Sequence, residues 1–321
     1  MINKPNLIII DKFEAEIPKS ITQKVNIFYN QQIDRDELSL IIGNYDYAVI
    51  STRIRFDKML LLKAKKLKWI IRLGAGVDHI DLKLCKELGI RVCNTPNSNI
   101  STVNEYLFGQ LLRVYKDYEL HNRMVVEGRF RNGINYYSDL KGKTIAVIGV
   151  GRIGGRVAET AKVFDMKVIG VDPYLTYEQR MVRKVDLWTN LDEAIKIADI
   201  ITLHVPLTDE TRYFLNKSHY SSMKDGVVLA NLARGELISL HELIESGFIN
   251  KFKKIIIDVY EKEPFVPNIN KDLLELFYFS PHAASYSIDS YIARANEAID
   301  EIGDILAGII PHGEIDPIKG Y

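Results

Sequence analysis

A glycine-rich loop in the middle of this sequence follows a run typical of a buried strand and precedes a run typical of a helix. The strand-like residues 144–149 lead into the pattern G-x-G-x-x-G, whose glycines stand at 149, 151 and 154. In such a unit the first glycine permits a tight turn, the second lets a pyrophosphate approach the backbone, and the third allows close helix packing. The free N–H groups of the helix N-terminus attract the phosphates. We therefore expect a dinucleotide cofactor to contact Gly149, Gly151, Arg152, Ile153 and Gly154.

A second strand-like run, residues 167–172, ends in an aspartate about 20 residues beyond the loop, as dinucleotide-binding units require. A carboxylate in this position accepts hydrogen bonds from the hydroxyl groups of the adenosine ribose. Its negative charge repels the additional phosphate of NADP. Asp172 therefore predicts NAD as the cofactor.

Short runs rich in β-branched residues recur along the whole chain and alternate with segments of helical periodicity. The runs are continuously apolar, which is typical of strands buried on both faces of a parallel sheet. Alternating strands and helices indicate the α/β class. We predict eleven strands, at residues 7–11, 25–29, 47–51, 69–73, 90–93, 144–149, 167–172, 199–204, 227–231, 254–258 and 277–280.

A chain of 321 residues is long enough for about two domains, and eleven strands are too many for one small sheet. A polar stretch, residues 94–100, precedes a helix that we expect to begin with the capping pattern Thr102-x-x-Glu105 and to continue to Tyr118. A second helix, near residues 287–307, returns the chain. We therefore predict two parallel-sheet α/β domains, the second of them inserted into a domain built from both termini. The predicted domain built from the termini is 1–98 plus 289–321, and the predicted NAD-binding domain is 99–288.

The composition, with 47% hydrophobic and 26% charged residues, is that of a globular protein. Lys and Arg number 42, as do Asp and Glu, and this zero net charge argues against a protein that coats nucleic acid. No apolar stretch approaches the roughly 18–20 residues of a membrane span, and the N-terminus lacks a signal core. The two cysteines, Cys85 and Cys93, indicate neither a disulfide framework nor a zinc site. We expect a cytoplasmic protein without metal, membrane or nucleic-acid partners.

Three polar segments follow predicted strands of the inserted domain, and each holds a residue suited to catalysis. Ligands of open α/β sheets bind outside the carboxyl ends of the strands, so we expect the three segments to face one site. Arg234 can hold a carboxylate and polarise a carbonyl. His282 can exchange a proton near neutral pH, and Glu263 can orient its imidazole and stabilise the charged form. Hydride transfer between a nicotinamide and a 2-keto acid requires this set.

These residues lie within ordered motifs that resemble the D-isomer-specific 2-hydroxyacid dehydrogenase family over nearly the whole chain. The segment from His204 to Asn216 looks like the family pattern H-x-P-x-T-x-x-T-x-x-x-x-N. One departure is Ala283-Ala284-Ser285, where glycine is frequent in the family. The resembling segments are residues 149–154, 204–216, 231–235, 258–264 and 281–282.

The resemblance implies two doubly wound, Rossmann- or flavodoxin-like parallel-sheet domains with an interdomain cleft, 1–98 plus 289–321 being the substrate domain and 99–288 the NAD-binding Rossmann domain. It implies that Arg234, Glu263 and His282 are the catalytic residues and that NAD is the cofactor. It also implies that Asp258 holds the nicotinamide carboxamide. Family members are commonly homodimers, so we expect a second copy of this chain as a partner. Further cofactor contacts are implied for His204, Val205, Pro206, Thr211, Leu232, Arg234, His282 and Ala284.

In the first domain, the resemblance implies that the backbone N–H groups of Ala75 and Gly76 bind the substrate carboxylate. Arg53 matches a substrate-side arginine of phosphoglycerate dehydrogenases, and Arg72 ends a neighbouring strand. These features favour 3-phosphoglycerate and 3-phosphohydroxypyruvate as substrates, and hence a role in serine biosynthesis. The alternatives are a hydroxypyruvate or glyoxylate reductase and a D-lactate-type dehydrogenase.

A different class of protein shares the same motifs. The C-terminal binding protein corepressors have this fold and its Arg-Glu-His set, and they act as NAD(H)-sensing binding proteins. They carry flanking segments for partner peptides that this sequence lacks, so we favour an enzyme. Glu263 disfavours formate, because the related formate dehydrogenases carry Gln at that position. Since the sequence ends at Tyr321, we expect no C-terminal regulatory domain.

Overall fold

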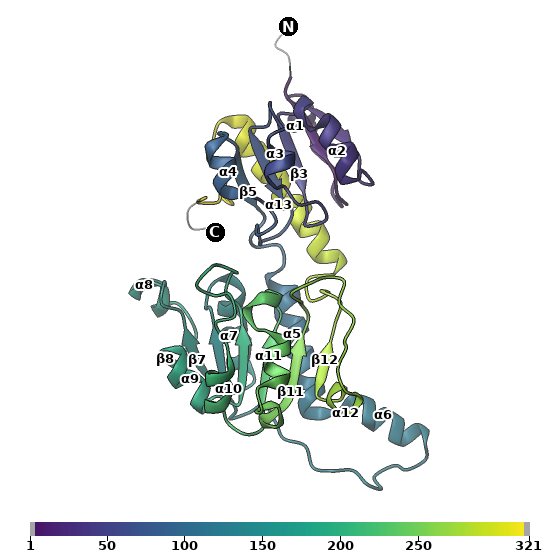
Figure 1. Ribbon diagram of the computed structural model, residues 1–321, viewed down its shortest axis with the longest axis vertical. Coiled ribbons are helices and arrows are strands. Elements are labelled where there is room, and N and C mark those ends of the chain that lie inside the picture. Colours follow the sequence, from purple (N-terminus) through teal and green to yellow (C-terminus); the bar gives the residue numbers. More distant parts are fainter. Residues whose placement is uncertain (1–3, 318–321) are drawn as a thin grey trace. The chain divides into compact units, whose positions relative to one another are not determined.

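The computed structural model describes residues 4–317 and contains two α/β units, each built on its own parallel sheet (Figure 1). Unit 1 contains the residues up to Asn99 and those from Tyr286 onward, and unit 2 contains Ile100–Ser285. The predicted domain boundaries, near residues 98 and 288, lie within a few residues of these unit boundaries. Two parallel-sheet α/β units confirm the predicted fold class. No helix in residues 4–317 is long and apolar enough to span a membrane.

Unit 1 has a five-stranded sheet in the order β2-β1-β3-β4-β5, and its strands pair in parallel. This is the flavodoxin-like order. Its elements are β1 (Asn6–Ile9), α1 (Lys19–Thr22), β2 (Asn26–Tyr29), α2 (Arg35–Ile41), η1 (Ile42–Asn44), β3 (Tyr47–Ile50), α3 (Lys58–Leu61), β4 (Trp69–Arg72), α4 (Leu82–Glu87), β5 (Arg91–Asn94) and α13 (Ile288–Ala307).

Two apolar clusters cover the two faces of this sheet. Successive strand residues enter different clusters, so that Ile70 of β4 packs in one and Ile71 in the other. The helix α13 supplies Ala298 and Ile302 to the second cluster. Because side chains alternate between the faces of a strand, covering both faces requires the continuously apolar runs seen in the sequence.

A buried carboxyl group lies on α13. Glu301 is only 2% exposed, and its Oε1 accepts a hydrogen bond from the N–H of Gly313 at 3.0 Å. Burial raises the pKa of Glu301 to about 7, and the nearby charges of Glu297, Asp304 and Asp300 act in the same direction. The neutral carboxyl is therefore the form that the fold favours.

Replacing Glu301 with Gln is expected to make stability less dependent on pH. The pKa of Glu301 in the folded protein lies above the ordinary value of 4.5, so the wild type loses stability as pH rises from 4.5 through 7. The glutamine stays neutral and keeps an oxygen for Gly313. Thermal unfolding should show Glu301→Gln matching the wild type near pH 4.5 and exceeding its stability at pH 8, by up to about 3 kcal/mol. Equal stability of the two proteins at pH 8 would contradict this expectation.

Unit 2 has a seven-stranded sheet in the order β12-β11-β10-β9-β6-β7-β8, and its strands also pair in parallel. The predicted strands account for all of these except β8, whose two residues leave no periodic pattern. The elements are α5 (Ile100–Lys116), α6 (Tyr118–Val126), β6 (Thr144–Ile148), α7 (Arg152–Val163), β7 (Lys167–Val171), α8 (Tyr177–Met181), β8 (Leu187–Trp188), α9 (Leu191–Ile197), β9 (Ile200–Leu203), α10 (Lys217–Ser222), β10 (Val227–Asn231), η2 (Gly235–Leu237), α11 (Leu240–Glu245), η3 (Ile249–Lys251), β11 (Phe252–Ile257), α12 (Lys271–Leu274) and β12 (Phe277–Phe279).

The first helix of unit 2 differs from the prediction. The helix α5 begins at Ile100, so Thr102 lies inside it and the predicted capping box is wrong. It also ends before Tyr118, because Asp117 adopts a left-handed conformation with φ of 44°. The Asp117 side chain then caps α6 by accepting a hydrogen bond from the N–H of Leu120. An aspartate at this position therefore divides what the spacing presented as one helix.

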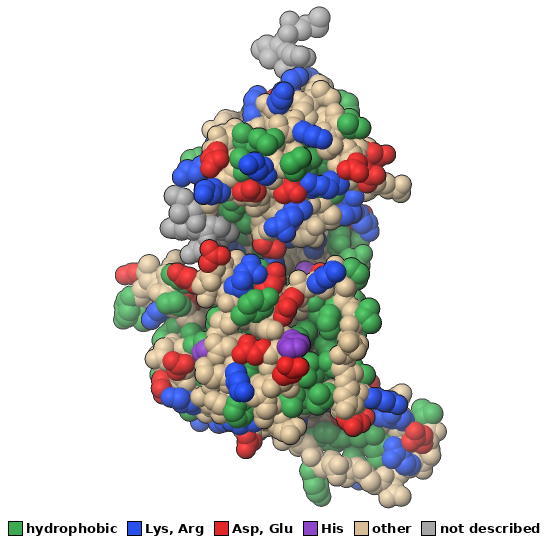
Figure 2. All heavy atoms as spheres, in the orientation of Figure 1, with side chains coloured by type: hydrophobic (Ala, Val, Ile, Leu, Met, Phe, Trp, Pro, Cys, Tyr) green, Lys and Arg blue, Asp and Glu red, His purple; other side chains and the backbone are tan. Residues whose placement is uncertain are grey.

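Beyond this break, α6 and the loop after it extend away from the sheet of unit 2 (Figure 1). Figure 2 shows apolar side chains among charged ones on this projecting segment. Val126 is 78% exposed and Phe130 is 71% exposed. Large apolar side chains exposed to this degree on one segment are typical of surfaces that contact another protein.

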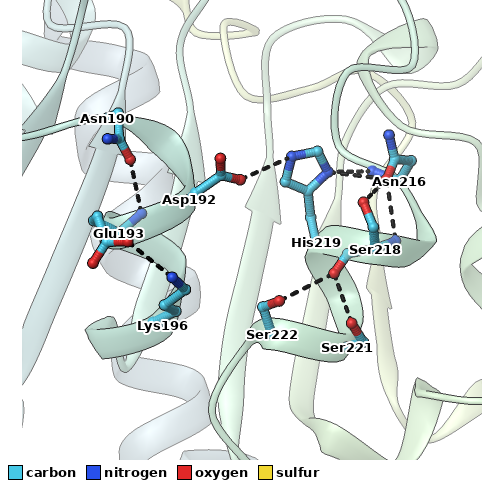
Figure 3. Close-up of polar contacts among 9 residues, drawn as sticks. All are labelled: Asn190, Asp192, Glu193, Lys196, Asn216, Ser218, His219, Ser221 and Ser222. Atoms are coloured by element: carbon cyan, nitrogen blue, oxygen red, sulfur yellow. Dashed lines mark hydrogen bonds and ion pairs between the residues drawn. The ribbon is translucent and has the colours of Figure 1, made fainter.

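Polar side chains begin two helices on one side of the unit 2 sheet (Figure 3). Asn190 caps α9, and Asn216 caps α10 by accepting a hydrogen bond from the N–H of Ser218 at 3.1 Å. His219 connects the cap of α10 with the first turn of α9, because its Nδ1 lies 3.0 Å from Asn216 and its Nε2 lies 3.6 Å from Asp192. Asn216, the last residue of the family-like segment, thus starts a helix in this structure.

Candidate active site

The glycine loop lies at the point where the strand order of the unit 2 sheet reverses, beside β6 and β9. A Cβ on Gly149 would lie 2.7 Å from the carbonyl oxygen of His204, and a Cβ on Gly154 would lie 2.0 Å from the carbonyl oxygen of Gly149. Neither position can accept a side chain without movement of the backbone. At Gly151, the N-cap of α7, a Cβ would meet nothing within 4 Å. The start of α7 is therefore open to a pyrophosphate. Its first turn consists of Arg152, Ile153 and Gly154.

Asp172 directly follows β7, next to this loop. One carboxylate oxygen accepts a hydrogen bond from the N–H of Val150 at 2.9 Å, and the other accepts one from the N–H of Tyr174 at 3.1 Å. These bonds hold the carboxylate in place and leave lone pairs on both oxygens. The arrangement fits the hydroxyl groups of an adenosine ribose.

The loop after β9 carries the predicted cofactor contacts His204, Val205, Pro206 and Thr211. Burial lowers the pKa of His204 to about 4, so its imidazole is neutral at neutral pH. The Nε2 atom of His204 lies 2.9 Å from the hydroxyl of Thr202. The hydroxyl of Thr211 donates a hydrogen bond to the carbonyl of Pro206 at 2.7 Å, which shapes the loop.

The loop after β10 carries Leu232 and Arg234. The Asn231 side chain shapes this loop by donating a hydrogen bond to the carbonyl of Arg234 at 2.8 Å. A Cβ on Gly235 would lie 2.0 Å from the carbonyl carbon of Tyr260. The absence of a side chain at Gly235 thus lets the loop with Arg234 pack directly on the segment that leads to Glu263.

Asp258 follows β11 and is almost completely buried, with 1% exposure. Its carboxylate accepts hydrogen bonds from the hydroxyl of Ser280 at 2.6 Å and from the N–H groups of Ala283 and Ala284 at 2.7 and 2.9 Å. Asp258 therefore holds the loop after β12, which carries His282. Its implied contact with the nicotinamide carboxamide stays a prediction.

His282 and Glu263 form the central polar pair of unit 2. The Nδ1 atom of His282 lies 3.0 Å from both carboxylate oxygens of Glu263. The backbone of His282 is left-handed, with φ of 54°, and its N–H donates to the carbonyl of Asp258 at 2.8 Å. The side chains of the pair are 42% and 41% exposed. Because Nδ1 faces the carboxylate, Nε2 is the nitrogen available to a reacting group.

Sequence reasoning missed Tyr260, which joins the loops after β11 and β12. Its hydroxyl donates a hydrogen bond to the carbonyl of Ser280 at 2.7 Å, and its ring stacks on Phe265 at 4.3 Å. Burial raises the pKa of Tyr260 to about 12, so the hydroxyl keeps its proton and remains a donor. An aromatic residue between Asp258 and Glu263 is a weak signal on its own, because strand ends often carry aromatic core residues.

Arg53, Ala75 and Gly76 lie in unit 1, after β3 and β4. Arg53 donates hydrogen bonds from Nε to Asp11 at 2.8 Å and from its terminal nitrogens to the carbonyls of Ile33 and Ile10. Its guanidinium thus links the segment after β3 to the segments that follow β1 and β2. Ala75 and Gly76 lie in a partly exposed loop. Arg72, at the end of β4, is buried and donates to the carbonyl of Leu73 at 2.8 Å.

The family model for the NAD binding domain of D-isomer specific 2-hydroxyacid dehydrogenases matches residues 108–284. A hydroxypyruvate reductase of Thermotoga maritima is 34% identical over 275 residues, which cover 85% of this chain and 89% of that protein. The chain belongs to the D-isomer-specific 2-hydroxyacid dehydrogenase family. The predicted membership is therefore confirmed.

Other relatives of this dehydrogenase differ in the substrate that they are named for. A D-3-phosphoglycerate dehydrogenase of Archaeoglobus fulgidus is 34% identical over 280 residues, which cover 86% of this chain but 50% of that protein. The crystal structure of a D-lactate dehydrogenase of Aquifex aeolicus with NAD and lactic acid has a TM-score of 0.77 and 28% identity, covering 94% of this chain and 96% of that one. The chain is thus an NAD-dependent oxidoreductase of D-2-hydroxy acids, and the predicted cofactor NAD is confirmed.

Proposed function

We propose that this dehydrogenase interconverts 3-phosphoglycerate and 3-phosphohydroxypyruvate, with hydroxypyruvate as the second candidate substrate. The hydrogen-bonded pair of His282 and Glu263 carries the assignment to 2-keto and 2-hydroxy acids. Arg53 and Arg72 follow or end the neighbouring strands β3 and β4, which favours a phosphorylated acid. Two observations favour hydroxypyruvate. The Thermotoga maritima hydroxypyruvate reductase aligns with this chain over 89% of its own length. Arg53 is already hydrogen-bonded to Asp11, which leaves its guanidinium less available to a substrate phosphate.

In the proposed reaction, the cofactor when bound would accept a hydride as NAD during oxidation of the hydroxy acid and donate one as NADH during reduction of the keto acid. Arg234 holds the substrate carboxylate and polarises the carbonyl through its two parallel N–H groups. The amides of Ala75 and Gly76 bind the carboxylate as well. During reduction, protonated His282 donates its Nε2 proton to the carbonyl oxygen, and during oxidation neutral His282 accepts the hydroxyl proton. Glu263 holds Nδ1 and stabilises the charged imidazole.

The substrate proposal is tested by NADH oxidation with a panel of 2-keto acids. The panel contains 3-phosphohydroxypyruvate, hydroxypyruvate, glyoxylate and pyruvate. We expect the highest kcat/KM with 3-phosphohydroxypyruvate. A clear preference for hydroxypyruvate would replace the first candidate by the second. Tight NADH binding without turnover of any acid would instead support an NAD(H)-sensing binding protein.

The charge at Asp172 is expected to set the cofactor preference. Asp172→Asn keeps a side-chain oxygen for one backbone N–H group but removes the negative charge that repels the phosphate of NADP. The ratio of kcat/KM for NADH to that for NADPH should fall roughly 10- to 100-fold, the effect of losing one hydrogen bond to a charged group. Asp225→Asn is the matched control, because the Asp225 side chain is 89% exposed. An unchanged ratio in Asp172→Asn would remove this residue from the ribose site.

The proposed assembly is a homodimer. Its support is the projecting segment of unit 2, which carries apolar side chains among charged ones (Figure 2). Val126 and Phe130 on this segment are exposed and require a partner surface to be buried. Light scattering on the purified protein should give about twice the chain mass of 36.7 kDa. A mass equal to that of one chain would exclude the dimer. The cytoplasmic location stays a prediction.

A further inference from the structure

Two backbone amides stand open in the loop after β4. Within residues 4–317, the N–H groups of Ala75 and Gly76 donate no hydrogen bond, and both residues are partly exposed. Gly74, which precedes them, has φ of 116° and is buried, and its own N–H is engaged. Two adjacent free amides of this kind form a site for an anionic group.

Two buried residues at the end of β5, the strand next to β4, hold this loop: Asn94 is the last residue of β5 and Thr95 follows it. Asn94 is 6% exposed and Thr95 is fully buried. The Asn94 side chain donates a hydrogen bond from Nδ2 to the carbonyl of Ala75 at 2.5 Å. The hydroxyl of Thr95 accepts one from the N–H of Gly74 at 2.6 Å, and the N–H of Thr95 reaches the carbonyl of Gly74 at 3.3 Å.

Because peptide bonds are planar, these contacts also fix the direction in which the N–H groups of Ala75 and Gly76 point. The carbonyl of Ala75 and the N–H of Gly76 belong to one trans peptide plane, so they point in opposite directions. The same holds for the carbonyl of Gly74 and the N–H of Ala75. The Asn94 side chain binds the carbonyl of Ala75 and the Thr95 N–H reaches the carbonyl of Gly74, so both N–H groups point away from β5. The Thr95 hydroxyl fixes Gly74, and with it the start of this loop, by accepting the Gly74 N–H.

The two residues are themselves held firmly. Asn94 pairs with Arg72 in the parallel register of β5 and β4, and its N–H donates to the carbonyl of Gly313 at 2.9 Å. A Cβ on Gly313 would lie 2.0 Å from the carbonyl oxygen of Asn94, so these backbones are in close contact. The hydroxyl of Ser98 donates to the carbonyl of Thr95 at 2.9 Å.

We infer that Asn94 and Thr95 are positioning residues for substrate binding, because they orient the amides of Ala75 and Gly76 toward the carboxylate of a 2-keto acid. This inference rests on the proposed function, which assigns the carboxylate to these amides. Asn94 and Thr95 do not touch the substrate. Their loss therefore weakens substrate binding and leaves the proton transfer at His282 and the NADH site of unit 2 in place.

The test uses the full-length enzyme and the 2-keto acid that the wild type turns over best. In Thr95→Val the hydroxyl is replaced by a methyl group of similar size, whereas Thr95→Ser keeps the hydroxyl. We expect KM for the acid to rise about tenfold in Thr95→Val, with kcat and the Kd for NADH within about twofold of the wild type. Thr95→Ser should keep a wild-type KM. If Thr95→Val matches the wild type, or if Thr95→Ser raises KM as much, the inference is wrong.

If Thr95→Val does not fold, a second pair of variants tests the same inference. Asn94→Ala removes the hydrogen bond to the Ala75 carbonyl and should raise KM about tenfold. Asn97→Ala is the matched control, because Asn97 is on the same segment but its side chain binds Glu297. An equal KM in the two variants overturns the inference. A wild type that turns over no acid overturns the proposed function itself, and with it this role of the two residues.

Discussion

His282→Ala is expected to lower kcat for the 2-keto acid by about 10²–10⁴-fold, the range that general acid–base catalysis contributes. The variant loses the Nε2 proton while the rest of unit 2 keeps its sheet and its glycine loop. The Kd for NADH, measured by fluorescence, should therefore change by less than about threefold, well under one lost hydrogen bond to a charged group. Stopped-flow and steady-state kinetics on the same preparation separate the two effects.

The control for this variant is a histidine of the same unit without a place in the site. The His241 side chain is 80% exposed, and its Nε2 lies 3.3 Å from Glu245 on the same helix. His241→Ala should retain wild-type kcat. Turnover of His282→Ala within about tenfold of the wild type would show that another group supplies the proton.

The structure explains why a histidine is held so firmly in an unfavourable backbone conformation. A left-handed backbone at a residue other than glycine costs about 1–3 kcal/mol and persists only where neighbouring contacts enforce it. At His282 the contacts come from Asp258, whose backbone accepts the His282 N–H and whose carboxylate accepts the following two amides. The buried Asp258 thus fixes the position from which the imidazole meets Glu263.

The fold class could be predicted because the pattern of apolar residues records which surfaces are buried. Neighbours such as Ile70 and Ile71 are both apolar because both faces of the sheet are covered. The limits of elements were harder to predict. Thr102 and Glu105 match a helix start, yet the helix begins earlier, and the break at Asp117 depends on a cap that spacing alone does not reveal.

The candidate site could be predicted as far as the topology of the sheet determines it. Residues that follow neighbouring parallel strands meet at one edge, which is why Glu263 and His282 form a pair. The partners of individual polar groups depend on contacts across long sequence separations. The pairing of Arg53 with Asp11 and the use of Asp258 to hold the loop after β12 are of this kind.

Arg234→Ala is expected to reduce kcat/KM for the 2-keto acid by about 10²–10⁴-fold, because it removes two hydrogen bonds to a charged group, each worth about 1.5–3 kcal/mol. Arg234→Lys should recover only part of this loss, since an ammonium keeps the charge but not the planar fork. The control is Arg156→Ala on α7, because the Arg156 side chain is 52% exposed and pairs with Glu159 on the same helix. Because Arg234 is also an implied cofactor contact, the Kd for NADH is measured as well, and a rise in KM for the keto acid well beyond any change in that Kd identifies the guanidinium as a ligand of the keto acid. Full activity of Arg234→Lys would mean that charge alone is sufficient and that the fork is not used.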